Sequence, residues 1–172
     1  MYNKTETMTI IQFLQQQLEQ EGNTTRRMLQ RIPDDKLDWQ PHEKSMTIKR
    51  LASHIAELPT WIGMVLHTDE LDFENNPYQP VDITSTAQLL EFFEKNLAEG
   101  KAQLVGAKEE VLDKIWTLRS GANIFSAEPK VAVMRMALSQ IIHHRAQLGV
   151  YLRLLDVPIP GSYGPSADEN NF

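Results

Sequence analysis

The stretch Ser139-Gln140-Ile141-Ile142-His143-His144-Arg145-Ala146-Gln147 lies in a segment whose apolar residues recur every three or four positions. This spacing predicts an amphipathic helix over residues 129–155, because residues three and four apart share one helix face. The predicted core-facing stripe consists of Met134, Ala137, Leu138, Ile141, Leu148, Leu152 and Leu155. The position of two adjacent histidines beside such a stripe indicates a role other than simple exposure to solvent.

Three further segments have the same apolar spacing and predict helices over residues 7–32, 46–66 and 85–108. Pro59 should bend the second of these, because proline removes a backbone donor and crowds the preceding turn. We expect residues 67–83 to form a polar loop, and residues 112–130 to be irregular with turns at Gly121 and Pro129. The tail, residues 156–172, is too rich in proline and glycine to be helical. The pattern favours an all-α fold in one domain, residues 1–172.

Composition restricts the classes of function. The chain has 172 residues, a formal charge of −6 and no cluster of Lys and Arg, which argues against a nucleic-acid partner. It has no apolar run long enough to cross a bilayer and no signal-peptide pattern, so we expect a cytoplasmic protein with no membrane partner. Cysteine is absent, so any bound metal must rely on histidine or oxygen ligands.

A helical wheel separates the two adjacent histidines of the last helix. His144 lies about 50° from the centre of the apolar stripe and Gln140 about 90° on the same flank, whereas His143 lies about 150° away. His143 should therefore face solvent or a partner subunit. Gln140 and His144 are one turn apart, a spacing at which helices present two ligands to one metal. If His54, which borders the apolar face of the second helix, lies opposite, then three side chains converge and leave coordination positions open.

Several of these residues also have simpler interpretations. A lone histidine such as His54 is often a buried imidazole hydrogen-bonded to a carbonyl or carboxylate. Glu21 and Thr25 fall inside the apolar stripe of the first helix and indicate either a partly wet helix end or a polar wall of a central cavity. Arg145 could bind an anionic substrate or pair with a buried carboxylate such as Glu21. We interpret Trp61 as a core or rim aromatic residue.

Three stretches together resemble the DinB family of damage-inducible proteins, to which metal dependence is attributed. They are Leu51-Ala52-Ser53-His54-Ile55-Ala56, the run from His143 to Arg153, and Val157-Pro158-Ile159-Pro160-Gly161-Ser162-Tyr163-Gly164-Pro165-Ser166-Ala167-Asp168. The likeness runs from about residue 8 to 169. It implies a four-helix bundle with a long crossover connection and a homodimer. It also implies a divalent metal held by His54, Gln140 and His144.

This chain departs from the family pattern at one predicted metal ligand. The position of Gln140 usually holds histidine, or a carboxylate in some relatives. An amide oxygen is a weaker donor than imidazole. Gln140 therefore either coordinates weakly, is replaced by His143, or leaves the site vacant as a polar pocket. His143 is disfavoured by its wheel angle.

Two functions remain open. One is a divalent-metal-dependent enzyme with an unknown substrate, either a thiol-dependent transferase or a hydrolase-like enzyme, that uses zinc, nickel, manganese or iron. The other is a non-catalytic dimeric binding or stress-response protein whose metal site is degraded at Gln140. In either case the outer face of the last helix, with His143, Gln147 and Val150, is a candidate homodimer surface.

Overall fold

The computed structural model describes residues 7–170 and contains five helices. They are α1 (Ile10–Leu29), α2 (Ile48–Glu57), α3 (Thr60–His67), α4 (Thr86–Leu104) and α5 (Lys130–Leu154). Hydroxyl side chains cap three of the helix starts. Thr9 forms a capping box with Gln12, and Thr47 and Ser85 accept from backbone N–H groups of α2 and α4. Such caps satisfy donors that the first helical turn leaves unpaired.

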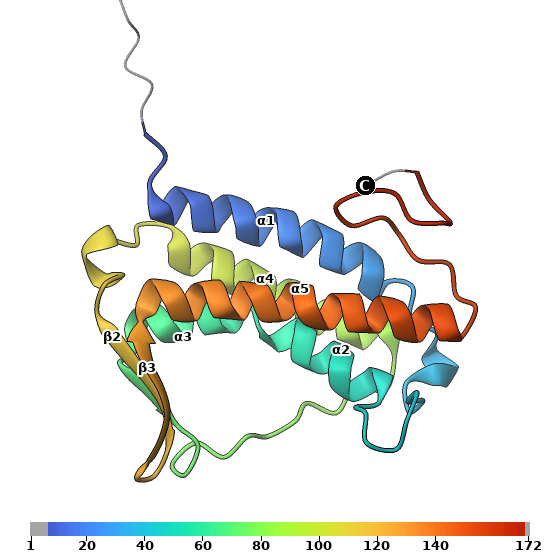
Figure 1. Cartoon of the computed structure of the whole chain (residues 1–172), viewed down its shortest axis with the longest axis horizontal. Coiled ribbons are helices and arrows are strands. Elements are labelled where there is room, and N and C mark those ends of the chain that lie inside the picture. Colours follow the sequence, from blue (N-terminus) through green and yellow to red (C-terminus); the bar gives the residue numbers. More distant parts are fainter. Residues whose placement is uncertain (1–6, 171–172) are drawn as a thin grey trace, which may run out of the picture.

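The helices form a four-helix bundle in which α2 and α3 together make one of the four rods (Figure 1). α1 packs against α4 and α5, and the α2–α3 rod packs against the same two helices. The core is built from the stripes that the sequence predicts, and Leu18, Leu51, Leu89 and Leu148 are fully buried. A long connection, residues 68–85, crosses from α3 to the start of α4 (Figure 1). The bundle and its crossover agree with the predicted architecture.

Pro59 divides the predicted second helix instead of only bending it. α2 ends at Glu57 and α3 begins at Thr60. Turn-like bonds from Trp61 N to Leu58 O and from Ile62 N to Pro59 O carry the chain through the break. Gly100 of α4 fits against this break, since a Cβ built on it would lie 2.5 Å from Pro59 O.

The all-α prediction is wrong in one region, because the molecule also contains a small sheet. β1 (Glu70–Asp72) pairs in parallel with β2 (Ile115–Ser120), which pairs antiparallel with β3 (Asn123–Pro129). Gly121 opens the two-residue turn between β2 and β3 with φ 56°, a conformation that favours glycine and is typical of tight hairpins. Trp116 of β2 is buried at the end of the bundle and donates from Nε1 to Thr68 Oγ1. The region predicted to be irregular is therefore a hairpin.

Of the two interpretations of Glu21 and Thr25, the partly solvent-exposed helix end is wrong, because both residues are buried. Arg145 of α5, itself buried, donates from one guanidinium nitrogen to Glu21 Oε2 over 2.7 Å and to Thr25 Oγ1 over 3.1 Å. The pairing of Arg145 with Glu21 confirms one of the two interpretations of this arginine. Tyr163 of the tail joins the same cluster by donating its hydroxyl to Glu21 Oε1 over 2.7 Å. The irregular tail, as far as residue 170, thus packs along α1 and α5 (Figure 1).

Candidate metal centre

The structure brings together the three residues predicted to hold a metal. His54 lies on α2, and Gln140 and His144 lie one turn apart on the facing α5. Gln140 Oε1 is 3.3 Å from His54 Nε2 and 3.3 Å from His144 Nε2. The two imidazole rings meet edge to face with 4.9 Å between their centroids. One amide oxygen and two ring nitrogens therefore converge across the bundle.

Each ring is held from its other nitrogen by a residue three positions further along its own helix. His54 Nδ1 lies 2.6 Å from Glu57 Oε1, and His144 Nδ1 lies 2.7 Å from Gln147 Oε1. Carboxylate and carbonyl oxygens accept hydrogen bonds, so the proton of each neutral imidazole sits on Nδ1. In the neutral form of each ring, the Nε2 lone pair then faces Gln140 Oε1. This is the arrangement by which neighbouring groups orient metal-binding histidines in proteins.

Burial keeps His144 in the neutral form that a metal ligand requires. Loss of solvent lowers the pKa of its imidazole, and the hydrogen bond to Gln147 opposes this shift. His54 and His143 lower the pKa further because a second positive charge nearby is unfavourable. The ring is therefore neutral at neutral pH, and one of its two nitrogens carries a lone pair.

The donor set fits a divalent ion in spacing and in electronic character. Donors about 2.0–2.1 Å from a tetrahedral ion lie about 3.3–3.4 Å from one another, which matches the two measured separations. Gln140 Nε2 contacts Met136 Sδ at 3.0 Å, which leaves the oxygen end of the amide toward the histidines. Two ring nitrogens and one amide oxygen, all potential ligand atoms, thus converge. Among residues 7–170 no group of three His, Cys, Asp or Glu is placed to hold a metal, because the third donor is an amide.

The remaining histidines stay outside this centre. His143 is exposed, as the wheel predicts, so it does not replace Gln140. His42 and His67 are also exposed, and His67 bonds to Gln103 instead.

The sequence-based prediction did not include two site residues, Glu57 and Gln147. Its placement of Gln147 on the outer face of the last helix was wrong, because Gln147 is half-buried and contacts His144. The signal for both was present, since each lies three positions after one of the two inward-facing histidines. Residues at this spacing are neighbours on a helix surface. Glu57 has a further partner, because Tyr78 of the crossover donates its hydroxyl to Glu57 Oε2 over 3.0 Å.

A cavity of about 570 Å³ opens beside His54 and Glu57. Residues of α2, α3, β1 and the crossover line it, and Trp61 and Met64 form part of its wall. Its volume falls within the range of small-molecule sites. The centre therefore borders a space large enough for a substrate.

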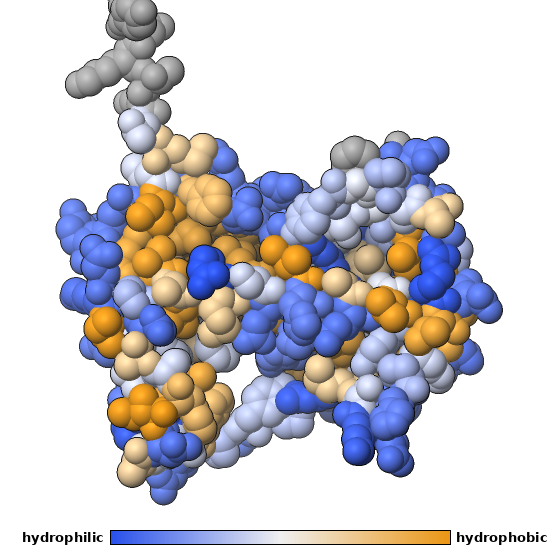
Figure 2. Space-filling model, viewed as in Figure 1, coloured by the Kyte–Doolittle hydropathy of each residue, from blue (hydrophilic) through white to orange (hydrophobic). Residues whose placement is uncertain are grey.

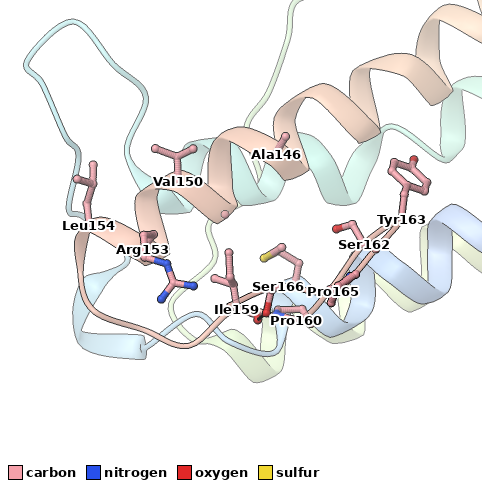
Figure 3. A pocket seen from close by; sticks show the side chains of 14 residues that line it. Ala146, Val150, Arg153, Leu154, Ile159, Pro160, Ser162, Tyr163, Pro165 and Ser166 are labelled. Carbon is pink, nitrogen blue, oxygen red and sulfur yellow. Dashed lines mark hydrogen bonds between the residues drawn. The ribbon is translucent and has the colours of Figure 1, made fainter. Parts of the chain in front are cut away.

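A second cavity, of about 540 Å³, lies between the tail, α5 and Met28 of α1 (Figure 3). Val150 and Leu154 of α5 line it together with Ile159 of the tail, and none of the three candidate ligands does. Figure 2 shows apolar colouring near the C-terminal end of α5, where Val150 and Leu154 are exposed.

The family model described as the DinB family matches residues 1–171. The chain belongs to the DinB family. One relative is the protein YrdA of Bacillus subtilis, which is 25% identical over 153 residues that cover 87% of this chain and 85% of YrdA. The residues that carry the family resemblance in the sequence include His54 and His144, which the structure places in one centre.

Two solved structures share the fold. YfiT from Bacillus subtilis, a probable metal-dependent hydrolase with an unusual four-helix bundle topology, superposes with a TM-score of 0.64 at 12% identity. The match covers 90% of this chain and 94% of YfiT. The mycothiol-dependent maleylpyruvate isomerase superposes with a TM-score of 0.57 at 12% identity, over 81% of this chain and 60% of the isomerase. In residues 7–170 no helix is long and apolar enough to cross a membrane.

Proposed function

We propose that this DinB-family protein is a metal-dependent enzyme in which His54, Gln140 and His144 hold one divalent ion. The observation that carries the proposal is the convergence of three potential ligand atoms, with 3.3 Å between Gln140 Oε1 and each Nε2. Three protein ligands with positions left for water or substrate are typical of catalytic metal sites. Zinc, nickel, manganese and iron all accept imidazole ligands.

When bound, such an ion supplies a Lewis acid that polarises a substrate or lowers the pKa of a bound water or thiol. The residues of the chain position the reaction. Glu57 and Gln147 fix the two imidazole rings, and the cavity beside His54 admits the substrate. The likeness to YfiT supports a hydrolase-like reaction, and the likeness to the mycothiol-dependent isomerase supports a thiol-dependent transfer.

Metal titration of chelator-treated protein that carries no histidine tag tests the proposal. We expect about one equivalent of zinc to bind to the natural protein, and His54→Ala to abolish this binding. Gln140→His should tighten it by at least about tenfold, because imidazole is a better donor than an amide oxygen. A protein that takes up no zinc, nickel or manganese, or a Gln140→His variant with unchanged affinity, would contradict the proposal.

The second candidate function is a non-catalytic dimeric binding or stress-response protein. Gln140 favours it, since a neutral amide is a weak third ligand. Under this alternative the donors form a polar pocket filled by water, and the natural protein binds no metal. The same titration distinguishes the two functions, because only the enzyme requires stoichiometric uptake.

A further inference from the structure

The cavity beside His54 has an apolar wall on one side. Trp61 and Met64 of α3, Leu71 of β1 and Phe73 just after it line this wall, and all four are partly buried. Trp61 is backed by Trp116, whose ring centroid lies 6.1 Å away. A wall of this kind gains free energy by covering an apolar body of several carbon atoms.

The lining of the cavity also includes a cation, Arg50, that is paired with no carboxylate in the described part of the chain. Arg50 lies one turn before His54 on α2, so both side chains share a helix face. Arg50 donates one N–H to the Tyr78 hydroxyl, and its guanidinium carbon lies 4.4 Å from the centroid of that ring. Within residues 7–170 it forms no ion pair with a carboxylate. Its remaining N–H donors are available, and a guanidinium is well suited to bind a carboxylate.

An ion in the candidate metal centre would add positive charge at the edge of this cavity, which His54 lines and Gln140 and His144 do not. Two imidazoles and one amide are neutral ligands, so a divalent ion bound there keeps its full charge. Glu57 is the one acidic residue that lines the cavity, and both of its carboxylate oxygens already accept hydrogen bonds. With a divalent ion bound, Arg50 and the ion together outweigh the single negative charge of Glu57, so an anionic group placed between Arg50 and His54 would meet net positive charge.

We infer that this cavity binds an amphipathic organic anion, with its charged group between Arg50 and the metal centre and its apolar body against Trp61, Met64 and Phe73. The part of the inference that involves the metal rests on the proposed function. Arg50 and the apolar wall act without it. The inferred substrate class is a small organic acid with an aliphatic or aromatic body, which suits the volume of the cavity.

The test compares octanoate with its neutral analogue octanamide on metal-free protein. Binding is followed by NMR through the indole N–H signals of the three tryptophans. We expect octanoate to shift the signal of Trp61 saturably and to leave that of Trp39, which packs on Tyr151, unchanged. Arg50→Gln should weaken octanoate binding by about tenfold and octanamide binding by less than about twofold, since only the anion loses a charge-assisted hydrogen bond.

Two further variants locate the site. Phe73→Ser should weaken both probes, because it shortens the apolar wall, whereas Arg135→Gln on the exposed face of α5 should change neither. Circular dichroism verifies that each variant is folded. The inference is overturned if octanoate shows no saturable binding, if Arg50→Gln weakens both probes equally, or if Arg135→Gln matches Arg50→Gln.

Repeating the titration with zinc separates this inference from the proposed function. Bound zinc should tighten octanoate binding and leave octanamide binding unchanged, because only the carboxylate meets the added charge. An unchanged octanoate affinity in zinc-loaded protein would overturn the placement of the anion beside the metal. Failure to take up zinc would refute the proposed function, whereas the metal-free comparison would still decide the anion site.

Discussion

His54 and Glu57 lie three residues apart on α2 and are joined by a contact of 2.6 Å between Nδ1 and Oε1. The carboxylate holds the proton on Nδ1 and turns Nε2 toward Gln140. We expect Glu57→Ala to weaken zinc binding about 10- to 100-fold, the usual effect of removing a group that orients a ligand. Competition with a chromophoric chelator measures the affinity. Glu91→Ala, at an exposed position of α4, is the control. Equal affinity for Glu57→Ala and the natural protein would contradict this role.

The lowered pKa of His144 predicts how stability depends on pH in metal-free protein. Burial makes the folded state bind a proton less readily than the unfolded state, whose imidazole has its ordinary pKa of 6.5. The unfolded state therefore gains protons first as the pH falls below that value, and the free energy of unfolding decreases. Denaturation with urea between pH 7.5 and 5.5 should show this loss, and His144→Gln should reduce it. An identical pH dependence in the two proteins would exclude His144 as its source.

The buried pair of Arg145 and Glu21 predicts an asymmetric effect of substitution. Arg145→Leu leaves the buried Glu21 carboxylate without its cationic partner and should destabilise the protein by about 3–5 kcal/mol. The double variant Arg145→Leu, Glu21→Leu should be more stable than Arg145→Leu, because no charge is then left unpaired. Denaturation with urea compares them, and Arg135→Leu on the surface should lie within about 0.5 kcal/mol of the natural protein. A double variant less stable than Arg145→Leu would show that the unpaired charge is not the cause.

The homodimer stays a prediction that light scattering can test. Val150 and Leu154 are about 60% exposed on the outer face of α5, as apolar residues at a subunit contact are in an isolated chain. We expect the mass of a dimer at micromolar concentration and a shift toward monomer in Val150→Asp, which places a charge in the contact. Ile124→Asp, on the exposed hairpin, is the control. A natural protein that is monomeric under these conditions would refute the prediction.

The helices were predictable from the sequence because apolar spacing, proline and capping residues act locally. Gln140 and His144 share one helix, so their relationship also followed from spacing alone. The hairpin β2–β3 was missed, because its strands are short and only Trp116 in β2 is fully buried, which leaves little apolar alternation to detect. The contact of β1 with β2 joins segments about 45 residues apart and has no local signal.

The orientation of the side chains in the candidate metal centre was only partly predictable, because it depends on contacts between residues far apart in the sequence as well as on helical spacing. The wheel angles placed His144 inward and His143 outward, as the structure has them. No wheel could show that Gln140 presents its oxygen rather than its nitrogen to both rings, because that depends on the contact with Met136. The approach of Tyr78 to Glu57 depends on the path of the crossover, which sequence spacing does not determine.

Anomalous diffraction from crystals grown with zinc tests directly whether His54, Gln140 and His144 hold one metal ion. Data collected above and below the zinc absorption edge locate the ion without reference to the ligands. We expect one strong anomalous peak about 2.0–2.2 Å from His54 Nε2, His144 Nε2 and Gln140 Oε1. Ordered density for these three side chains with no anomalous peak between them, in crystals that hold zinc elsewhere or lack it, would show that they do not form a metal site.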